Sequence, residues 1–392
     1  MNLLYVTPLW SGLKKFFFEG DLTVTGMPAF FNVFESLLKD SNINRIYVIV
    51  FVYGVDKPIR VPEVYKEKLV VYPYFIKNRL QLIKYSFSAI FFGKKIVKSK
   101  HISVIYGHGT ISALASIMGK LTNVKHYRRI YGTFLYQKVK LKKRIYLTNF
   151  FEYLSFRLKC NGLIITNDGT SGNKVFEKIG NSNTPLYFLM NGVNKEIQVS
   201  DDNPTVPFFC YIARIDRWKR QNLLINVLGH IKKEGEVEIP KTYIIGSVFD
   251  KDYYKELLLE IDKQGLNNII EFTGPLPKKK VYSYIKHALA SFSFYKFSNL
   301  GNVFLETLTL GGLLVSINEQ GSLDLIQEDT YIKVNNNIPE IAGVIKNIIN
   351  SKDTPEKFNS IRESAKRFSK YQLKNWNERI DIEKNIILNK NV

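Results

Sequence analysis

Short apolar runs and longer amphipathic stretches alternate along this chain, and this alternation limits its fold more than any other feature. The first half reads LLYVT, PAFFNVFESLLKDS, IYVIVFVYG, YSFSAIFFGKKIVKS, and VIYGH followed by ISALASIMGKL. Runs such as IYVIVFVYG and GLIITN are apolar throughout, which is typical of strands covered on both faces. The pattern predicts an open, mostly parallel α/β sheet.

The same rhythm begins again after a polar stretch, VSDDNPTVP. Helical stretches separate FFCYIAR, TYIIGS, IIEFTG, ASFSFY and LLVSIN, which predicts a second Rossmann-like domain. The chain closes with an amphipathic helical stretch whose expected apolar anchors are Phe368, Tyr371, Leu373 and Trp376. We expect a first domain over residues 1–198, a linker over 199–207, a second domain over 208–370, and a C-terminal helix over 371–392 that packs back on the first domain.

Positive charge is concentrated in the first half. The net charge is +21, and residues 1–200 contain 29 Lys or Arg and 11 Asp or Glu, against 27 and 24 in residues 201–392. No acidic residue lies between Glu67 and Glu152. Such a face attracts polyanions, and we expect contact with an anionic membrane surface. Nucleic acid is the alternative, but no nucleic-acid-binding motif is present.

The two cysteines, Cys160 and Cys210, have the spacing of neither a disulfide framework nor a zinc site, which favours a reducing compartment. The longest apolar run, residues 46–55, is too short to cross a bilayer, and the N-terminus lacks the pattern of a signal peptide. We therefore expect a cytoplasmic protein with peripheral contact at the inner face of the cell membrane.

Two basic residues follow the first strand of the second half at a spacing that suits a diphosphate. Arg214 comes after FFCYIA and Lys219 is five residues further on, so both fall in one strand-to-helix loop. Cations in such a loop can converge on the phosphates of a nucleotide. A solvated basic loop, RIDRWKR, is the alternative interpretation.

The segment SNLGNVFLETLTLGG supplies a second candidate. Gly301 and Asn302 precede a predicted helix whose first turns carry Glu306. Free amide groups at the start of a helix bind anions, and a carboxylate can accept hydrogen bonds from two hydroxyl groups. Taken alone, Glu306 fits a structural carboxylate equally well.

The order of these segments resembles the retaining glycosyltransferases of the GT-B fold, in the large family 4 (group 1) that uses nucleotide sugars without a metal. The resemblance covers nearly the whole chain and is carried by YIARIDRWKRQNLLINVL, TYIIGS, IIEFTGPLPKKKVYSYIKHALASFSF and NLGNVFLETLTLGGLLVSINEQGSLDLI. It implies an α/β fold of two Rossmann-like domains that face each other across a cleft.

The resemblance also implies roles for individual residues. Arg214 and Lys219 would hold the donor diphosphate, and Glu306 would bind the ribose. The other donor-binding candidates in this half are Gly246, Phe272, Ser298, Asn299, Gly301, Asn302 and Val303. The family signature usually has a second glutamate eight positions before the first, which contacts the donor sugar, whereas this chain has Ser298 there.

The first half resembles the same family less specifically. TVTGMPAFFNVFESLLKD places Gly26 where the family has a glycine beside the donor phosphates. VIYGHGT resembles the segment with a histidine near the sugar, which makes His108 a catalytic candidate beside Arg214 and Lys219. A structural histidine is the alternative. Where the family often has His-Gly in the next segment, this chain has Tyr131 and Gly132.

The resemblance therefore implies an enzyme that moves a hexose from a nucleoside diphosphate, most simply UDP, to a glycan or lipid-linked glycan with retention of configuration. Synthesis of a bacterial surface polysaccharide is the expected setting. We expect no cofactor and no metal site, because the one DxD-like match, Asp250-Lys251-Asp252, falls where the family has a variable loop. Two alternatives stay open: a non-catalytic GT-B-shaped partner subunit, favoured by Ser298 and Tyr131, and a nucleotide-sugar epimerase.

Overall fold

The protein was analysed as a computed structural model, which describes residues 1–10, 12–22, 28–55, 57–200, 204, 207–319, 323–351 and 355–389. It contains two compact units. Unit 1 comprises Met1–Asn167, Ser171–Asn191 and Trp376–Val392, and unit 2 comprises Asp168–Thr170 and Gly192–Asn375. Most of the linker expected at 199–207 lies outside the described residues.

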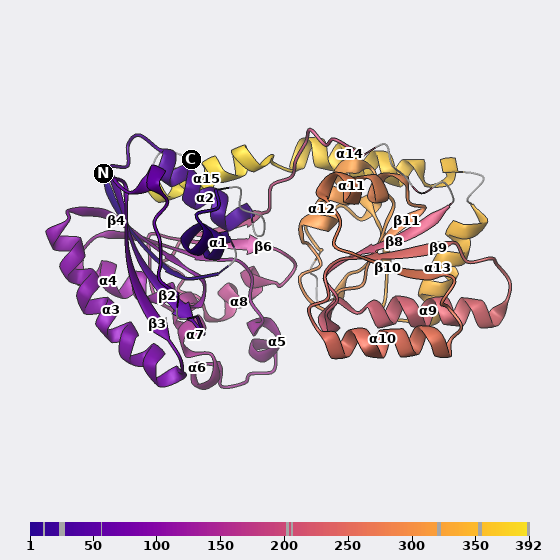
Figure 1. The fold of residues 1–392 in the computed structure, drawn as a ribbon, viewed down its shortest axis with the longest axis horizontal. Coiled ribbons are helices and arrows are strands. Elements are labelled where there is room, and N and C mark those ends of the chain that lie inside the picture. Colours follow the sequence, from indigo (N-terminus) through magenta and orange to yellow (C-terminus); the bar gives the residue numbers. More distant parts are fainter. Residues whose placement is uncertain are drawn as a thin grey trace. The chain divides into compact units, whose positions relative to one another are not determined.

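Unit 1 is built on a seven-stranded sheet (Figure 1). Its strands are β1 (Asn2–Pro8), β2 (Arg45–Tyr53), β3 (Leu69–Ile76), β4 (Ile102–His108), β5 (Lys125–Ile130), β6 (Gly162–Asn167) and β7 (Leu186–Met190). They lie in the order β3-β2-β1-β4-β5-β6-β7, and each of these neighbouring pairs is parallel. The first strand is therefore central, and the order reverses between β1 and β4.

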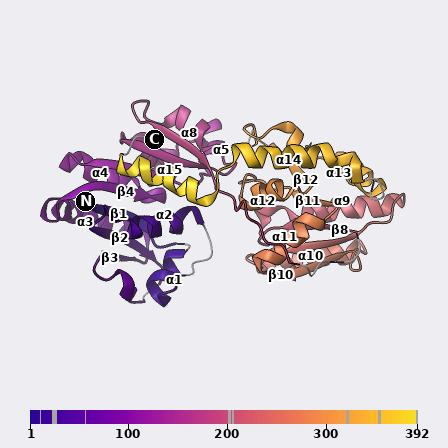
Figure 2. The ribbon, with the colours of Figure 1, turned by 90° about the horizontal axis from the view of Figure 1, so that it is seen from above.

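Helices cover both faces of this sheet (Figure 2). They are α1 (Gly12–Glu19), α2 (Pro28–Lys39), α3 (Arg79–Ser99), α4 (Ala113–Thr122), α5 (Leu135–Lys140), α6 (Ile145–Thr148), α7 (Phe150–Arg157), α8 (Gly172–Ile179) and α15 (Trp376–Leu388). α3 and α4 share a core with one face, and α1, α2 and α15 share a core with the other. Because both faces are covered, β2 is buried without interruption from Ile46 to Val52.

Buried charges anchor α15 to the sheet of unit 1. Glu383 of α15 and Arg129 of β5 are both fully buried, with Glu383 Oε2 3.1 Å from Arg129 Nε. Arg379, one turn earlier on α15, lies 2.9 Å from the same oxygen. The hydroxyl of Tyr106 on β4 donates to the other carboxylate oxygen at 2.5 Å. One buried carboxylate is thus paired with two buried guanidinium groups.

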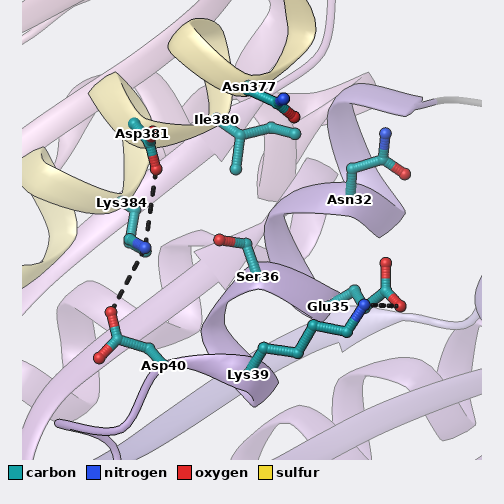
Figure 3. Close-up of a pocket in the computed structure, with 9 residues that line it drawn as sticks. All are labelled: Asn32, Glu35, Ser36, Lys39, Asp40, Asn377, Ile380, Asp381 and Lys384. Atoms are coloured by element: carbon teal, nitrogen blue, oxygen red, sulfur yellow. Dashed lines mark ion pairs between the residues drawn. The ribbon is translucent and has the colours of Figure 1, made fainter.

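A pocket of about 560 Å³ lies between α2 and α15 (Figure 3). Lys384 of α15 lies 3.4 Å from Asp40 and 3.6 Å from Asp381, and Lys39 lies 2.7 Å from Glu35. The charged side chains of this pocket are therefore paired with one another.

Unit 2 repeats the plan with six strands. These are β8 (Phe208–Ile212), β9 (Lys241–Ile245), β10 (Ile270–Gly274), β11 (Ala290–Ser293), β12 (Leu314–Ile317) and β13 (Ile332–Val334). Their order is β10-β9-β8-β11-β12-β13, and each of these neighbouring pairs is parallel. The order reverses between β8 and β11, and in open α/β sheets ligands bind beyond the carboxyl ends of the strands at such a point.

The helices of unit 2 are α9 (Gln221–Glu234), α10 (Lys251–Lys263), α11 (Lys278–His287), α12 (Asn302–Leu310), α13 (Ile338–Asn350) and α14 (Asn359–Gln372). α9, α10 and α13 share a core with one face of the sheet, α11 contributes to a second cluster on the other, and α14 packs against α12. Two parallel, doubly wound Rossmann-like units are thus present, as the alternation of apolar and amphipathic segments predicts. No helix among the described residues is long and apolar enough to cross a membrane.

The C-terminal helical stretch is two helices rather than one. α14 ends at Gln372, and Val193 N donates to the carbonyl of Lys374 at 3.0 Å before α15 begins. Leu373 and Phe368 are buried, as expected of apolar anchors, but Tyr371 is 69% exposed, so that expectation is wrong. Tyr371 lies three residues after Phe368, on a part of α14 that the core does not cover.

Candidate functional site

The loops after β8 and β11, on the two sides of the point where the strand order of unit 2 reverses, form the candidate site. Lys296 N, in the loop after β11, donates to the carbonyl of Trp218, in the loop after β8, at 2.9 Å. Tyr211, fully buried on β8, donates its hydroxyl hydrogen to the carbonyl of Lys219 and accepts from Phe294 N at 3.2 Å. These contacts join the two loops and fix their backbone without any ligand.

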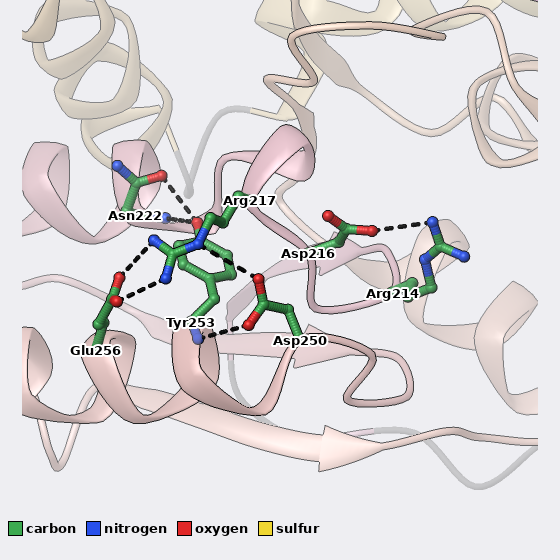
Figure 4. A network of polar contacts seen from close by, with 7 residues as sticks. All are labelled: Arg214, Asp216, Arg217, Asn222, Asp250, Tyr253 and Glu256. Carbon is green, nitrogen blue, oxygen red and sulfur yellow. Dashed lines mark hydrogen bonds and ion pairs between the residues drawn. The ribbon is translucent and has the colours of Figure 1, made fainter.

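Two of the four basic residues in the loop after β8 are paired with residues elsewhere in unit 2. Arg217 lies 2.6 Å from Glu256 of α10 and 3.3 Å from Asp250 (Figure 4). Arg220 lies 2.7 Å from Glu319. These ion pairs hold the loop in place and leave neither arginine free for a ligand.

Arg214 is less constrained. Its guanidinium group lies 2.9 Å from Asp216, two residues along the same loop, and over the ring of Phe249, with 4.1 Å between the guanidinium carbon and the ring centre. The side chain is 40% exposed. It can therefore contact a ligand while Asp216 and Phe249 orient it.

Lys219 is held by aromatic rings. Its Nζ lies 3.6 Å from the ring centre of Tyr295 and 4.2 Å from that of Trp218. No carboxylate of the described residues lies within ion-pairing distance of this ammonium group. Burial, and after it the charge of Arg214, lower the pKa of Lys219 to about 7. An anion bound beside Lys219 and Arg214 would supply the missing counter-charge.

Gly246 directly follows β9 and requires the absence of a side chain. Its φ is +154°, and a Cβ atom there would lie 2.1 Å from the carbonyl oxygen of Ala213. Gly246 therefore allows the chain after β9 to pass beside the loop that carries Arg214. Phe272, on β10, packs edge-on against Tyr254 of α10, with 5.0 Å between ring centres. The rings beside Arg214 are those of Phe249 and Trp218.

The start of α12 carries the remaining candidates. Gly301 is the N-cap residue, no side chain caps this end, and Asn302 and Val303 form the first turn. Glu306 is 6% exposed and lies 2.8 Å from Lys278 Nζ of α11, and Tyr282 donates to it at 3.4 Å. The carboxylate thus faces α11 and is bonded to a cation. Asn299 is buried and donates to the carbonyl of Ile317 at 2.6 Å, which holds the loop.

Ser298 meets a carboxylate from a distant part of the sequence. Its hydroxyl donates to Asp168 Oδ2 at 3.1 Å, and Leu300 N donates to the main-chain carbonyl of Asp168, also at 3.1 Å. Thr170 holds the other carboxylate oxygen through its hydroxyl at 2.7 Å and its amide at 3.1 Å. Burial raises the pKa of Asp168 in spite of these hydrogen bonds. Asp168 also acts electrostatically on Lys219.

His108 lies at the carboxyl end of β4 in unit 1, beside the point where that strand order reverses, and is fully buried. Its ring stacks on Tyr5 with 4.3 Å between centres, and its Nδ1 lies 2.8 Å from the hydroxyl oxygen of half-buried Tyr131. Burial, and then Arg129, lower the pKa of His108 well below its ordinary value. The imidazole is therefore neutral and separated from solvent.

Residues 193–368 match the family model of glycosyl transferases group 1. The match covers just under half of the chain and lies within unit 2. A curated relative, the capsular polysaccharide biosynthesis glycosyltransferase CapH of Staphylococcus aureus, is 26% identical over 217 residues. That match spans 52% of this chain and 58% of CapH.

Solved GT-B structures share the fold of this chain. HepE of Anabaena, solved in complex with UDP, superposes with a TM-score of 0.68 at 15% identity and covers 98% of this chain and 99% of its own. The lipopolysaccharide outer core galactosyltransferase WaaB gives the same TM-score at 15% identity, with 100% of both chains covered. At these identities the likeness establishes the fold alone.

Gly26 lies outside the described residues. Asp250, in the DxD-like match, caps α10 by accepting from Tyr253 N at 2.9 Å and pairs with Arg217 (Figure 4). Its carboxylate is therefore already used in holding the helix and the loop together.

Sequence reasoning missed Asp168 and the aromatic side chains around the two cations. Asp168 directly follows the apolar strand GLIITN, so its place at a carboxyl strand end was a readable signal. Its contact with Ser298, 130 positions away, could not be predicted from the sequence. Nothing in the sequence marked Trp218 or Tyr295 as a neighbour of the two cations, beyond the place of Trp218 next to Lys219 and of Tyr295 at the end of ASFSFY.

Proposed function

We propose that this chain is a retaining hexosyltransferase that takes a sugar from a nucleoside diphosphate, most simply UDP, and transfers it to a glycan or lipid-linked glycan in surface polysaccharide synthesis. The observation that carries the proposal is the pair Arg214 and Lys219, two cations without a committed distant partner at the carboxyl end of β8. The CapH match and the UDP complex of HepE support the same class of substrate.

The two cations suit the charge change of such a reaction. As the bond between sugar and diphosphate breaks, negative charge grows on the leaving phosphate. Arg214 and Lys219 would neutralise that charge from a backbone fixed before the donor arrives, which is electrostatic stabilisation of the transition state. Protein cations fill the role that a metal fills in other transferases, so the proposed reaction needs no metal and no cofactor.

We assign the binding of the donor's ribose and of its sugar to two carboxylates. Glu306 is the proposed ribose ligand, with Lys278 as its partner in the absence of donor. Asp168, hydrogen-bonded to Ser298, is the proposed ligand of the sugar hydroxyls, because it brings a carboxylate to the position at which related sequences usually have a glutamate. His108 is proposed to act through Tyr131, its hydrogen-bonding partner, because its own ring is buried.

A panel of four variants tests the proposal, with UDP-sugar hydrolysis and transfer as the activity and thermal shift with UDP as the binding assay. Arg214→Ala should lower kcat/KM about 100-fold or more, and Glu306→Ala should weaken UDP binding. Asp168→Asn should lower turnover while UDP binding is unchanged. Arg217→Ala is the matched control, because this arginine of the same loop is already paired with Glu256 and Asp250.

The alternatives give different results in the same assays. A protein that neither binds nucleotides nor transfers sugar would be a non-catalytic partner subunit. Conversion of the donor into an isomeric nucleotide sugar, with donor as the sole substrate, would identify an epimerase. Loss of activity in Arg217→Ala equal to that in Arg214→Ala would mean that the loop, rather than the proposed pair, is what the reaction needs.

The setting of the enzyme is also part of the proposal. Both cysteines are buried as free thiols, which is compatible with a reducing cytoplasm. The excess of basic residues in the first half supports peripheral contact with anionic lipids at the inner face of the cell membrane, where a lipid-linked acceptor would be found. No role in nucleic-acid binding is proposed.

A further inference from the structure

Helix α3 carries apolar side chains on two opposite sides. Ile90, Ile96 and Val97 are among the residues that it buries against the sheet of unit 1. Four large apolar side chains of the same helix are exposed: Leu80 (78%), Ile83 (48%), Phe87 (60%) and Phe91 (70%). Their spacing of three, four and four residues places them on one stripe along the helix. Single exposed apolar residues are common, but a continuous stripe marks a binding surface.

A groove of about 660 Å³ opens beside this stripe. Ile83 and Phe87 of α3 line it together with Leu114 of α4, and Leu147 and Phe150 at α6 and α7 close its other side. Leu147 and Phe150 are themselves largely exposed. The stripe and the groove form one apolar surface, which we call the α3–α7 face. Its groove has a volume in the range of pockets that hold apolar ligands, about 300–1,000 Å³.

Positively charged side chains lie beside the α3–α7 face. Arg79 lines the groove at the start of α3 and Lys84 is exposed one residue after Ile83. The exposed run Lys140–Arg144, KLKKR, leads directly into α6. Among the described residues that line the groove, the one acidic side chain is that of Glu152. It is half-buried and accepts from Thr133 Oγ1 at 2.7 Å, and burial raises its pKa. The acidic side chain is thus turned to an internal partner.

We infer that the α3–α7 face binds a bilayer that contains anionic lipids, with the stripe and the groove edge inserted among the acyl chains. Anionic head groups attract the flanking lysines and arginines, and the apolar side chains gain from leaving water, so one occupant satisfies both features. A second copy of this chain would instead bring the same cations together. The inference gives a surface to the membrane contact proposed above and does not depend on the donor chemistry of unit 2.

The experiment is sedimentation of the full-length protein with vesicles, without nucleotide. Wild type should sediment with vesicles of equal parts phosphatidylglycerol and phosphatidylcholine and not with pure phosphatidylcholine. Phe87→Ser/Phe91→Ser should weaken this binding about tenfold or more. Leu259→Ser/Tyr371→Ser is the matched control in unit 2, because Leu259 is 72% exposed and Tyr371 is similarly exposed, and it should bind as wild type does.

The cationic contribution has its own variant. Lys140→Gln/Lys142→Gln/Lys143→Gln should also weaken binding about tenfold or more and reduce its dependence on salt. All of these side chains are exposed, so the variants should keep the melting temperature of the wild type.

Equal binding to both kinds of vesicle, or equal binding by the Phe87/Phe91 and Leu259/Tyr371 variants, would overturn the inference. So would a dimer in solution that the Phe87/Phe91 change dissociates while wild type ignores vesicles, since the face would then join two copies. Donor hydrolysis is unaffected by these outcomes, which keeps this test separate from that of the proposed function.

Discussion

Lys219 is a cation in surroundings that disfavour its charge. Burial and the neighbouring Arg214 lower its pKa to about 7, and a diphosphate bound beside it would favour the protonated form. Below about pH 7 the ammonium is already charged, so donor affinity should be constant. Above about pH 7 binding must take up a proton, and affinity should fall by up to about tenfold per pH unit.

Calorimetric titration with a UDP-sugar, whose phosphates keep the same charge from about pH 6 to about pH 9, measures this dependence. Lys219→Arg serves as the control, because an arginine stays charged throughout that range and should flatten the profile. A wild-type profile as flat as that of Lys219→Arg would show that Lys219 does not titrate in the free protein.

The residues of the candidate site were predictable from sequence to different degrees. The five-residue spacing of Arg214 and Lys219 was enough to choose a loop. It could not show which of the loop's four basic side chains were available, because Glu256 and Glu319, which engage the other two, are far away in the sequence. The contact between Asp168 and Ser298 could not be predicted for the same reason, because hydrogen bonds between distant residues leave no local pattern.

Among the elements, the end of β9 requires a residue without a side chain at position 246. Gly246→Ala would place a methyl group 2.1 Å from the Ala213 carbonyl at a φ of +154°, and should lower the free energy of unfolding by at least about 2 kcal/mol. Urea unfolding measures the change. Gly343→Ala, within α13, is the opposite control, because nothing lies within 4 Å and alanine should stabilise the helix by about 0.5–1 kcal/mol. A change of the same sign in both variants would contradict this account.

The elements themselves were more predictable than their ends. The apolar runs that form β2 and β6 predicted strands covered on both faces. Together with the helical stretches between such runs, they predicted two doubly wound sheets. The break between α14 and α15 was not foreseen. It depends on Leu373 being buried and on Lys374 bonding to Val193, and neither contact alters the amphipathic pattern of the stretch.

For the molecule as a whole, the buried carboxylate of Glu383 links the C-terminal helix α15 to residues of β4 and β5 that are far away in the sequence. Glu383→Gln keeps the shape of the side chain but leaves Arg129 and Arg379 buried without a counter-charge, which should cost about 3–5 kcal/mol of unfolding free energy. Chemical denaturation monitored by tryptophan fluorescence gives the value. Asp381→Asn, on the same helix, removes an exposed charge 3.6 Å from Lys384 and should cost less than about 1 kcal/mol. Equal losses in the two variants would argue against the buried network.

The position of Glu383 near the C-terminus also affects the order in which the two units can fold during translation. Tyr106, which donates to Glu383, leaves the ribosome 277 residues before its partner, and all of α9 to α14 is translated in between. Domains generally fold in order as they emerge, N-terminal first. Until α15 has been synthesised, unit 1 lacks that helix, and Arg129 lacks the carboxylate of Glu383. Unit 1 can therefore complete its fold only after unit 2 has been translated.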